Sequence, residues 1–206
     1  MLDDIVRKEI IAPVSEPSEW VAPLAVAQKP NGRGLRLFVS LTRLNRYVRR
    51  PAYQVPTPRN ALAEIDGSAR FFSALDASDG YFQIALKPSC QHLRTFSTPW
   101  GRFKYLRATH GLCSSGDEYN RRQDEAFAGL QNFARVVDDL LLFHETFSDH
   151  IAGVCAILRA ARTARITFNP KKFVFAQQQL MWVGYHIKQG GFEVDPSKLM
   201  AISEFP

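Results

Sequence analysis

Apolar residues occur along this chain in short runs separated by turn residues, a pattern typical of β-strands. Such runs predict strands at residues 22–28, 35–41, 70–75, 94–97, 102–106, 181–187 and 191–194. The first two flank a glycine-rich stretch, Pro30-Asn31-Gly32-Arg33-Gly34, which predicts a hairpin. Further hairpins are predicted across Pro99-Trp100-Gly101 and across Gln189-Gly190.

Helical spacing and capping signals predict helices between these strands. Thr57-Pro58 is typical of a helix start, because a capping hydroxyl precedes proline at the first helical position. The predicted helices cover residues 3–10, 60–65, 117–130, 148–164 and 196–206. From residue 70 the order is strand, helix, hairpin, helix, strand, which is the split β-α-β arrangement of a ferredoxin-like sheet. The sequence therefore predicts an α+β fold.

Composition adds a few limits. The chain has 206 residues, enough for one large domain or two small lobes, and 46% of them are hydrophobic. No apolar run approaches the length that a membrane span needs, and the acidic start Met1-Leu2-Asp3-Asp4 is unlike a signal peptide. We therefore expect an intracellular, cytoplasmic protein that does not contact a membrane. The three cysteines are far apart and predict neither a disulfide framework nor a zinc site.

Positive charge is concentrated in one segment. Between Trp20 and Ala63 there is no acidic residue. The segment contains Lys29, Arg33, Arg36, Arg43, Arg46, Arg49, Arg50 and Arg59. Because the total net charge is +6, the remainder of the chain carries −2. A phosphate-facing surface for nucleic acid or nucleotides would need such a segment, whereas a solvated basic face usually tolerates interspersed acids.

Two adjacent carboxylates interrupt an apolar run, "RVVDDLLLF", at Asp138 and Asp139. They form either a simple hairpin tip or a site for metal ions. Neighbouring strand residues point to opposite faces, so both can face one site only if the turn bends them. A two-metal site also needs a carboxylate from an adjacent strand. Asp76 ends the strand at 70–75, and a split β-α-β sheet places that strand beside the hairpin.

Four ordered segments resemble the reverse transcriptase of gypsy-type long-terminal-repeat retrotransposons. They are "QKPNGRGLRLFVSLTRLN", "FFSALDASDGYFQI", "RVVDDLLLF" and "MWVGYHI" followed by "GGFEVDPSKLMAI". The resemblance is colinear from about Ile10 to Pro206. It implies a right-hand polymerase with fingers at about 1–55 and 84–114 and a palm at about 56–83 and 115–206. The family continues past this point, so we expect a polyprotein fragment or a shortened gene without a thumb.

The resemblance also implies the chemistry. Asp76, Asp138 and Asp139 match the catalytic aspartates that hold two Mg²⁺ ions, with Mn²⁺ as a substitute. Asp76 and Asp138 would bridge both ions, and Asp139 would support the ion that activates the primer 3′-hydroxyl. The matching nucleotide-binding residues are Lys29, Arg36, Ala77, Asp79, Gly80, Tyr81 and His110. From the residues alone, the alternative for Lys29 and Arg36 is a plain surface charge, and for Lys29 the two interpretations are close. The spacing by itself favours a core aromatic at Tyr81, and His110 is equally consistent with a structural role.

The chain departs from the family pattern at a few positions. Ser40 stands where aspartate is usual, and Val136 replaces the common aromatic two residues before the Asp pair. His110 replaces phenylalanine or glutamine, and Gly116 replaces proline. All three metal positions are retained, so the departures bear on nucleotide selection rather than on the metals.

The function implied is an RNA-directed DNA polymerase that is part of a retrotransposon polyprotein. Its partners would be an RNA or DNA template with its primer, deoxynucleoside triphosphates, and the polyprotein's thumb, connection and RNase H. Virus-like particles and a nuclear stage are further locations consistent with the family. The alternative is a truncated or domesticated remnant that binds nucleic acid without effective catalysis. A metal-dependent nuclease would not explain Lys29, Arg36 and the spacing of Tyr81.

Overall fold

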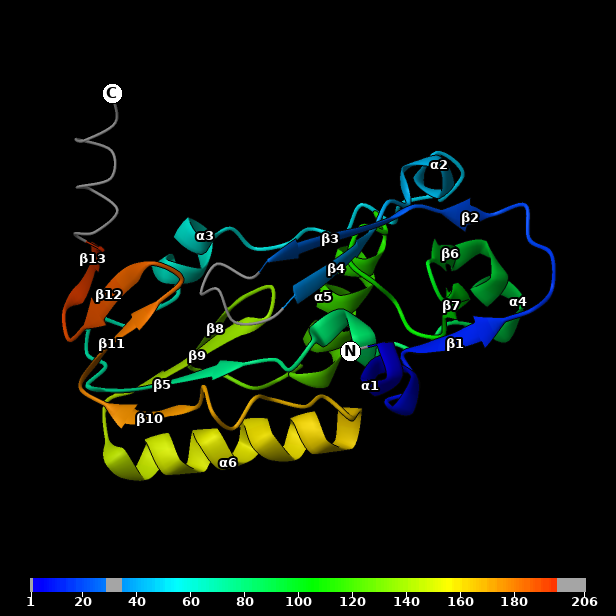
Figure 1. Ribbon diagram of the computed structural model, residues 1–206. Coiled ribbons are helices and arrows are strands. Elements are labelled where there is room, and N and C mark those ends of the chain that lie inside the picture. Colours follow the sequence, from blue (N-terminus) through cyan, green and yellow to red (C-terminus); the bar gives the residue numbers. More distant parts are fainter. Residues whose placement is uncertain (1, 29–34, 196–206) are drawn as a thin grey trace. The chain divides into compact units, whose positions relative to one another are not determined.

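The computed structural model describes residues 2–28 and 35–195 (Figure 1). The chain forms two compact units. The first unit comprises Met1–Tyr53 and Tyr81–Tyr119, and the second comprises Gln54–Gly80 and Asn120–Pro206. In the described part of the chain, no helix is long and apolar enough to cross a membrane.

The first unit is built on a four-stranded sheet and a separate hairpin. The sheet has the order β1 (Ile11–Val14), β7 (Gly101–Tyr105), β6 (Thr95–Thr98), β2 (Val21–Ala22), and the hairpin pairs β3 (Leu24–Gln28) with β4 (Leu35–Val39). Its short helices are α1 (Leu2–Arg7), α2 (Thr42–Asn45), α4 (Pro88–Gln91), and the 3₁₀ turns η1 (Gly80–Gln83) and η2 (His92–Arg94). The two hairpins predicted here are confirmed, although the tip of the first lies outside the described residues.

The second unit contains the predicted ferredoxin-like sheet. Its strand order is β10 (Val174–Gln177), β5 (Phe71–Asp76), β9 (Asp139–His144), β8 (Phe133–Val136), and every neighbouring pair is antiparallel. The helices are α3 (Pro58–Ala63), which Thr57 caps as predicted, α5 (Ser115–Ala126), which begins in the first unit, and α6 (Phe147–Ala164). The α+β fold is confirmed, and so is the predicted order from β5 to α6, but the last strand of this sheet is β10 and not the run at 181–187.

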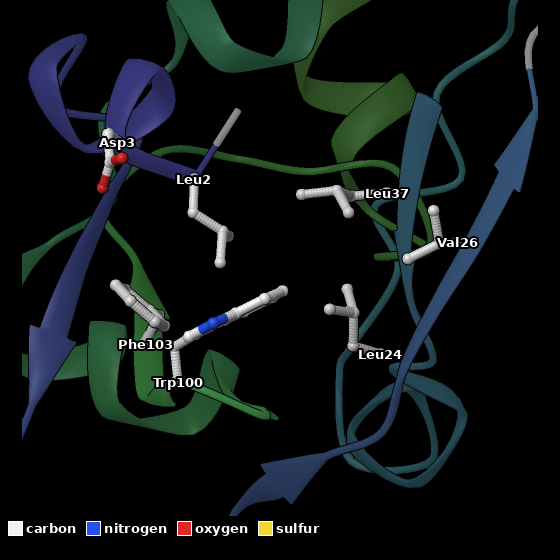
Figure 2. Close-up of a pocket in the computed structure, with 7 residues that line it drawn as sticks. All are labelled: Leu2, Asp3, Leu24, Val26, Leu37, Trp100 and Phe103. Carbon is white, nitrogen blue, oxygen red and sulfur yellow. The ribbon is translucent and has the colours of Figure 1, made fainter. Parts of the chain in front are cut away.

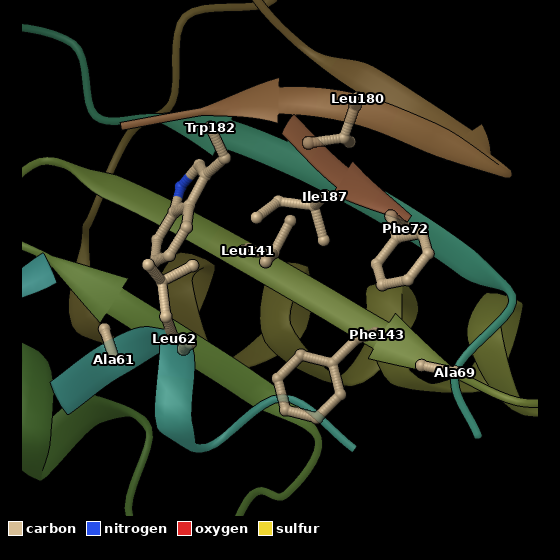
Figure 3. Packing of buried hydrophobic residues seen from close by; sticks show 10 residues of the cluster. Ala61, Leu62, Ala69, Phe72, Leu141, Phe143, Leu180, Trp182 and Ile187 are labelled. Atoms are coloured by element: carbon tan, nitrogen blue, oxygen red, sulfur yellow. The ribbon is translucent and has the colours of Figure 1, made fainter. Parts of the chain in front are cut away.

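Strand β9 is buried on both faces, which explains its continuous apolar sequence. Leu140 and Leu142 pack toward α6, together with Val154 and Ile157. The alternate residues of β9 join the cluster on the opposite face (Figure 3). That cluster consists of Ala61, Leu62, Ala69, Phe72, Ala134, Leu141, Phe143, Leu180, Trp182 and Ile187. The central strand is thus held firmly from both sides.

The C-terminal part of the described chain differs from the prediction. The run at 181–187 is two strands, β11 (Gln179–Trp182) and β12 (Tyr185–Lys188), which form a three-stranded sheet with β13 (Gly191–Val194). Val183 and Gly184 both have positive φ, as a tight two-residue hairpin turn requires. The pairing across Gln189-Gly190 is confirmed. The predicted helix after Pro196 lies outside the described residues.

The fourth strand of the main sheet is β10, which the sequence prediction missed. This strand is short and irregular, because its register with β5 shifts between Val174 and Gln177. Ala176 has a positive φ, and its amide donates to the Ser73 hydroxyl at 2.9 Å. A bulged strand lacks regular alternation, so its sequence carries no clear strand signal. The helix predicted at 117–130 is also displaced, since α5 ends at Ala126.

Gly153 of α6 provides a test of how closely the helix packs on the sheet. A Cβ atom at this position would collide with the imidazole of His144. A helical glycine-to-alanine change normally stabilises by up to about 1 kcal/mol. We predict that Gly153→Ala instead lowers the free energy of unfolding, by about 1 kcal/mol, because overpacking outweighs helix propensity.

Urea denaturation of Gly153→Ala, His144→Ala and the double variant measures this coupling. In the His144→Ala background the same glycine change should be neutral or stabilising. An equal loss in both backgrounds would contradict the predicted collision.

Candidate active site

The end of the β5–β9 pair brings the three predicted aspartates together. Asp76, the last residue of β5, lies opposite Asp139, the first residue of β9. Residues directly opposite each other in an antiparallel pair share a face. The amide of Ala77 donates to the carbonyl of Asp138 at 2.8 Å, so Asp138 lies beside the same strand end. The neighbouring positions expected from the sequence are therefore observed, while the roles of these residues stay predictions.

The β8–β9 turn differs in detail from the prediction. Val136 pairs with Asp139, so the tip consists of Val137 and Asp138, and Asp139 already belongs to β9. Val137 has a φ of 52°, an uncommon and strained conformation for a β-branched residue. The Gln123 amide donates to the Val137 carbonyl at 2.9 Å and fixes this conformation. The strained turn takes Asp138 out of strand alternation, which is the bend that a shared site requires.

Burial and neighbouring carboxylates raise the pKa values of two of these aspartates, Asp138 and Asp139. Burial, followed by the charges of Asp139, Asp76 and Asp79, raises the pKa of Asp138 to about 6. Burial and Asp76 also raise the pKa of Asp139. Among the described residues, the buried Oδ1 atom of Asp138 has no hydrogen-bond partner. The site thus concentrates negative charge that nearby side chains satisfy only in part.

Lys172 supplies a compensating charge that the sequence prediction missed. Its Nζ atom lies 2.8 Å from Oδ2 of Asp76. Its positive charge also lowers the pKa of Asp138 and of Asp139, against the larger effect of burial. The sequence signal was the turn Asn169-Pro170 followed by two lysines, but nothing in it shows that the turn lies beside Asp76.

The donor set fits a divalent cation, although the side chains do not close around one. Within residues 2–28 and 35–195, no three His, Cys, Asp or Glu side chains are grouped as metal ligands. Asp76 is instead paired with Lys172. The unpaired Oδ1 of Asp138 and its raised pKa nevertheless favour binding of a hard cation, which prefers carboxylate oxygen and relieves the repulsion.

The segment after Asp76 is fixed by backbone contacts in the second unit. Ala77 forms a β-bridge with Phe168, and the Ser78 amide donates to the Thr167 carbonyl at 2.9 Å. Asp79 has a φ of 50°, and its charge contributes to the raised pKa of Asp138. Asp79 therefore lies close enough to Asp138 to act on it, while Gly80 is buried at the start of η1.

In the first unit, Tyr81 belongs to a small aromatic group. Its ring centroid lies 4.8 Å from that of His110 and 5.7 Å from that of Tyr119. Tyr81 is half-buried and His110 is exposed, so neither is a core residue. A Cβ on Gly116 would stand 3.5 Å from the Tyr81 hydroxyl, an ordinary contact, so the space beside the tyrosine does not require glycine.

The basic segment is partly committed to structural contacts. Arg50 binds both carboxylate oxygens of Asp117, at 2.7 and 3.1 Å, and Asp117 is buried. The guanidinium of Arg43 lies 5.1 Å from the ring centroid of Trp20. Lys29 and the side chain of Arg36 lie outside the described part. At least two of the eight positive charges therefore stabilise the unit itself.

A cavity of about 440 Å³ in the first unit has a different character (Figure 2). It is lined by Leu2, Asp3, Leu24, Val26, Leu37, Trp100 and Phe103. The apolar side chains point toward one another across it, whereas the Asp3 carboxylate points away. This cavity offers apolar surface but not the carboxylate chemistry found at the end of β5.

Comparison with known proteins identifies the family. The family model described as "Reverse transcriptase (RNA-dependent DNA polymerase)" matches residues 29–187. The chain belongs to the reverse transcriptase family. The match includes Asp76, Asp138 and Asp139, and reverse transcriptases use divalent metal ions.

Curated relatives confirm the predicted resemblance to gypsy-type elements. The chain is 30% identical to the Retrovirus-related Pol polyprotein from transposon opus of Drosophila melanogaster. The sequence identity is 26% to the Retrovirus-related Pol polyprotein from transposon gypsy of the same species. It is 27% to the Enzymatic polyprotein of Cauliflower mosaic virus (strain NY8153). Each match includes 100% of this chain but only 21%, 20% and 30% of the relative, respectively.

Solved structures show the same fold. A foamy viral protease-reverse transcriptase dRH in complex with ds DNA superimposes with a TM-score of 0.91 at 18% identity. The foamy viral enzyme in complex with RNA/DNA hybrid gives 0.88 at 17% identity. Each of these structures covers 100% of this chain. The chain in turn covers 36% of the protein in the ds DNA complex and 27% of the protein in the RNA/DNA hybrid complex. The predicted reverse transcriptase fold is confirmed.

The raised pKa of Asp138 predicts a gain in stability when its charge is removed. Because the folded state raises this pKa above its ordinary value, ionisation destabilises the fold increasingly as pH rises through about 6. In metal-free protein at about pH 8, Asp138→Asn should raise the free energy of unfolding by about 1 kcal/mol, once solvent screening is allowed for.

Urea denaturation in the presence of a chelator tests this, with the exposed Asp4→Asn as the matched control. At about pH 4, where Asp138 is mostly protonated, the gain should largely disappear. A gain that is equal at both pH values would show that charge repulsion is not its cause.

Proposed function

We propose that this chain is the polymerising core of a reverse transcriptase, which adds deoxynucleotides to a primer on an RNA or DNA template. The observation that carries the proposal is the meeting of Asp76, Asp138 and Asp139 at one end of the sheet in a member of this family. The first unit would be the fingers and the second the palm. The chain spans less than a third of its curated relatives, so activity is proposed for this core rather than for a whole polyprotein.

In this proposal, Asp76, Asp138 and Asp139 hold two Mg²⁺ ions, and Mn²⁺ can replace them. When bound, the ions neutralise charge on the attacking and leaving oxygens of an in-line phosphoryl transfer. Asp138 is suited to this role because its Oδ1 atom is unpaired and its neighbours are carboxylates. Ala77 and Asp79 extend the same edge, where we expect the triphosphate to bind.

Tyr81 would exclude ribonucleotides by occupying the space of a 2′-hydroxyl. His110 packs against its ring and would hold it in place, as the 4.8 Å centroid distance supports. Arg36 and Lys29 are proposed to bind the triphosphate, for which the planar fork of arginine is well suited. Gly80 would allow the backbone to approach the nucleotide closely.

Template and primer are the proposed macromolecular partners. The solved relatives were determined in complex with RNA/DNA hybrid or double-stranded DNA. The basic segment from Trp20 to Ala63 supports phosphate binding here, even though Arg50 is engaged by Asp117. The rest of a Pol polyprotein, with thumb, connection and RNase H, would complete the machinery.

Primer extension by purified protein with Mg²⁺ or Mn²⁺ tests the function directly. Asp138→Asn should reduce extension by roughly a thousandfold or more, because a lost metal ligand removes transition-state charge stabilisation. Binding of the primer–template duplex should remain within about twofold, since phosphate contacts elsewhere supply most of the affinity.

Asp4→Asn, an identical chemical change on α1, should leave extension unaffected. Undiminished extension by Asp138→Asn would refute the catalytic assignment. Duplex binding without extension by the unaltered chain, with either metal, would favour the alternative function of a nucleic-acid-binding remnant.

The sugar-selection role of Tyr81 has its own test. Tyr81→Val should raise the relative use of ribonucleotides, measured as the ratio of kcat/KM values, by roughly tenfold or more, since a cavity replaces the ring. Tyr81→Phe keeps the ring and should retain discrimination. Equal discrimination in all three proteins would show that Tyr81 acts only through its packing with His110 and Tyr119.

A further inference from the structure

In the described part of the chain, Lys172 is the basic side chain that forms an ion pair with a candidate metal ligand, Asp76. Its Nζ atom lies 2.8 Å from Oδ2 of Asp76. The Asp76 side chain is 23% exposed and that of Lys172 is 60% exposed. The ion pair therefore lies at the rim of the carboxylate cluster, where solvent and dissolved ions reach it.

The position of Lys172 is set by the backbone. The amide of Asn169 donates to the Asp76 carbonyl at 2.8 Å, and the amide of Lys172 donates to the Asn169 carbonyl at 3.1 Å. Backbone hydrogen bonds thus attach the turn that carries Lys172 to Asp76, the residue that its ammonium group contacts. This arrangement makes the ion pair a built feature of the fold rather than a chance contact of a long side chain.

The charge of Lys172 acts beyond Asp76. It also lowers the pKa values of Asp138 and Asp139, so the charge of one ammonium group acts on three carboxylates. Asp79 adds a fourth negative charge that acts on Asp138. The cluster keeps an excess of negative charge even with the lysine in place, and it can therefore still attract a divalent cation.

We propose that Lys172 is the counter-ion of this cluster in the metal-free protein and that a divalent cation binding at Asp76 displaces its ammonium group. The inference rests on the proposed function, in which Asp76 is a metal ligand. The ammonium group occupies a lone-pair site on Oδ2 of Asp76 that a metal could use, and the two cations repel each other. Lys172 therefore competes with the metal and offsets part of the negative charge of the cluster while no metal is bound.

The competition is weak enough to be reversed by binding. Exposed ion pairs typically change an equilibrium by only about two- to fivefold. A divalent cation interacts with several carboxylates at once, whereas the lysine contacts one. Lys172 thus lowers metal affinity modestly and stabilises the empty site, and both effects can be measured without any polymerase assay.

Titration of the 206-residue chain with Mn²⁺, followed by the electron paramagnetic resonance signal of the free ion, tests the exchange. Lys172→Met should bind Mn²⁺ about two- to fivefold more tightly than the unaltered protein. The neighbouring exposed Lys171→Met is the matched control and should bind as the unaltered protein does. Lys172→Arg keeps the charge and should also behave like the unaltered protein.

Thermal unfolding gives a second readout. Without metal, Lys172→Met should unfold at a lower temperature than Lys171→Met, and saturating Mn²⁺ should remove the difference. Equal Mn²⁺ affinity for Lys172→Met and Lys171→Met would overturn the proposal. Weaker binding by Lys172→Met would also overturn it, by showing that the lysine positions Asp76 for the metal. Circular dichroism establishes that each variant is folded.

The outcome separates this inference from the proposed function on which it rests. If the unaltered chain does not bind Mn²⁺, or Asp138→Asn binds it equally well, the metal assignment itself is wrong. If binding is lost in Asp138→Asn but does not respond to Lys172→Met, the metal site stands and only the exchange is refuted.

Discussion

The register of β5 against β9 is the constraint on which the candidate site depends. It places Asp76 directly opposite Asp139 and the turn residue Asp138 beside both. A slip of one residue would send one of the paired aspartates to the other face of the sheet. Slippage is costly because Leu141 packs into one core and Leu142 into the other. The hydrophobic burial of a central strand thus fixes the geometry of charged groups at its end.

The site concentrates features that reduce stability. Val137 has a strained backbone, and burial together with mutual repulsion raises the pKa values of Asp138 and Asp139. Such features persist only where surrounding structure determines them strongly. Here the surroundings are the two packed faces of the second unit and the turn that brings Lys172 to Asp76. A site with unbalanced charge is well suited to a function that begins with binding a cation.

The departures from the family pattern have local explanations. Val136 packs against the core cluster of the second unit and pairs with Asp139, so a branched apolar side chain closes the turn. Ser40 is exposed and interacts with Thr42 at 3.3 Å, in a purely local contact. His110 packs on Tyr81 in the first unit. None of these positions is one of the three aspartates, which the chain retains.

The sequence alone determined the α+β class, the hairpins of the first unit, the β-α-β order as far as α6, and the neighbouring positions of Asp76 and the Asp pair. Local alternation and turn residues encode the strands, helices and hairpins. The topology of the split β-α-β unit then places the strand of Asp76 beside the hairpin of the Asp pair. Tertiary structure alone decided the pairing of β10 with β5, the strained φ of Val137 and the contact between Lys172 and Asp76. Each joins or bends segments through contacts with residues far away in the chain, such as Ser73 with Ala176 and Gln123 with Val137. No local pattern records such contacts, because they form only when the packed sheet brings the segments together.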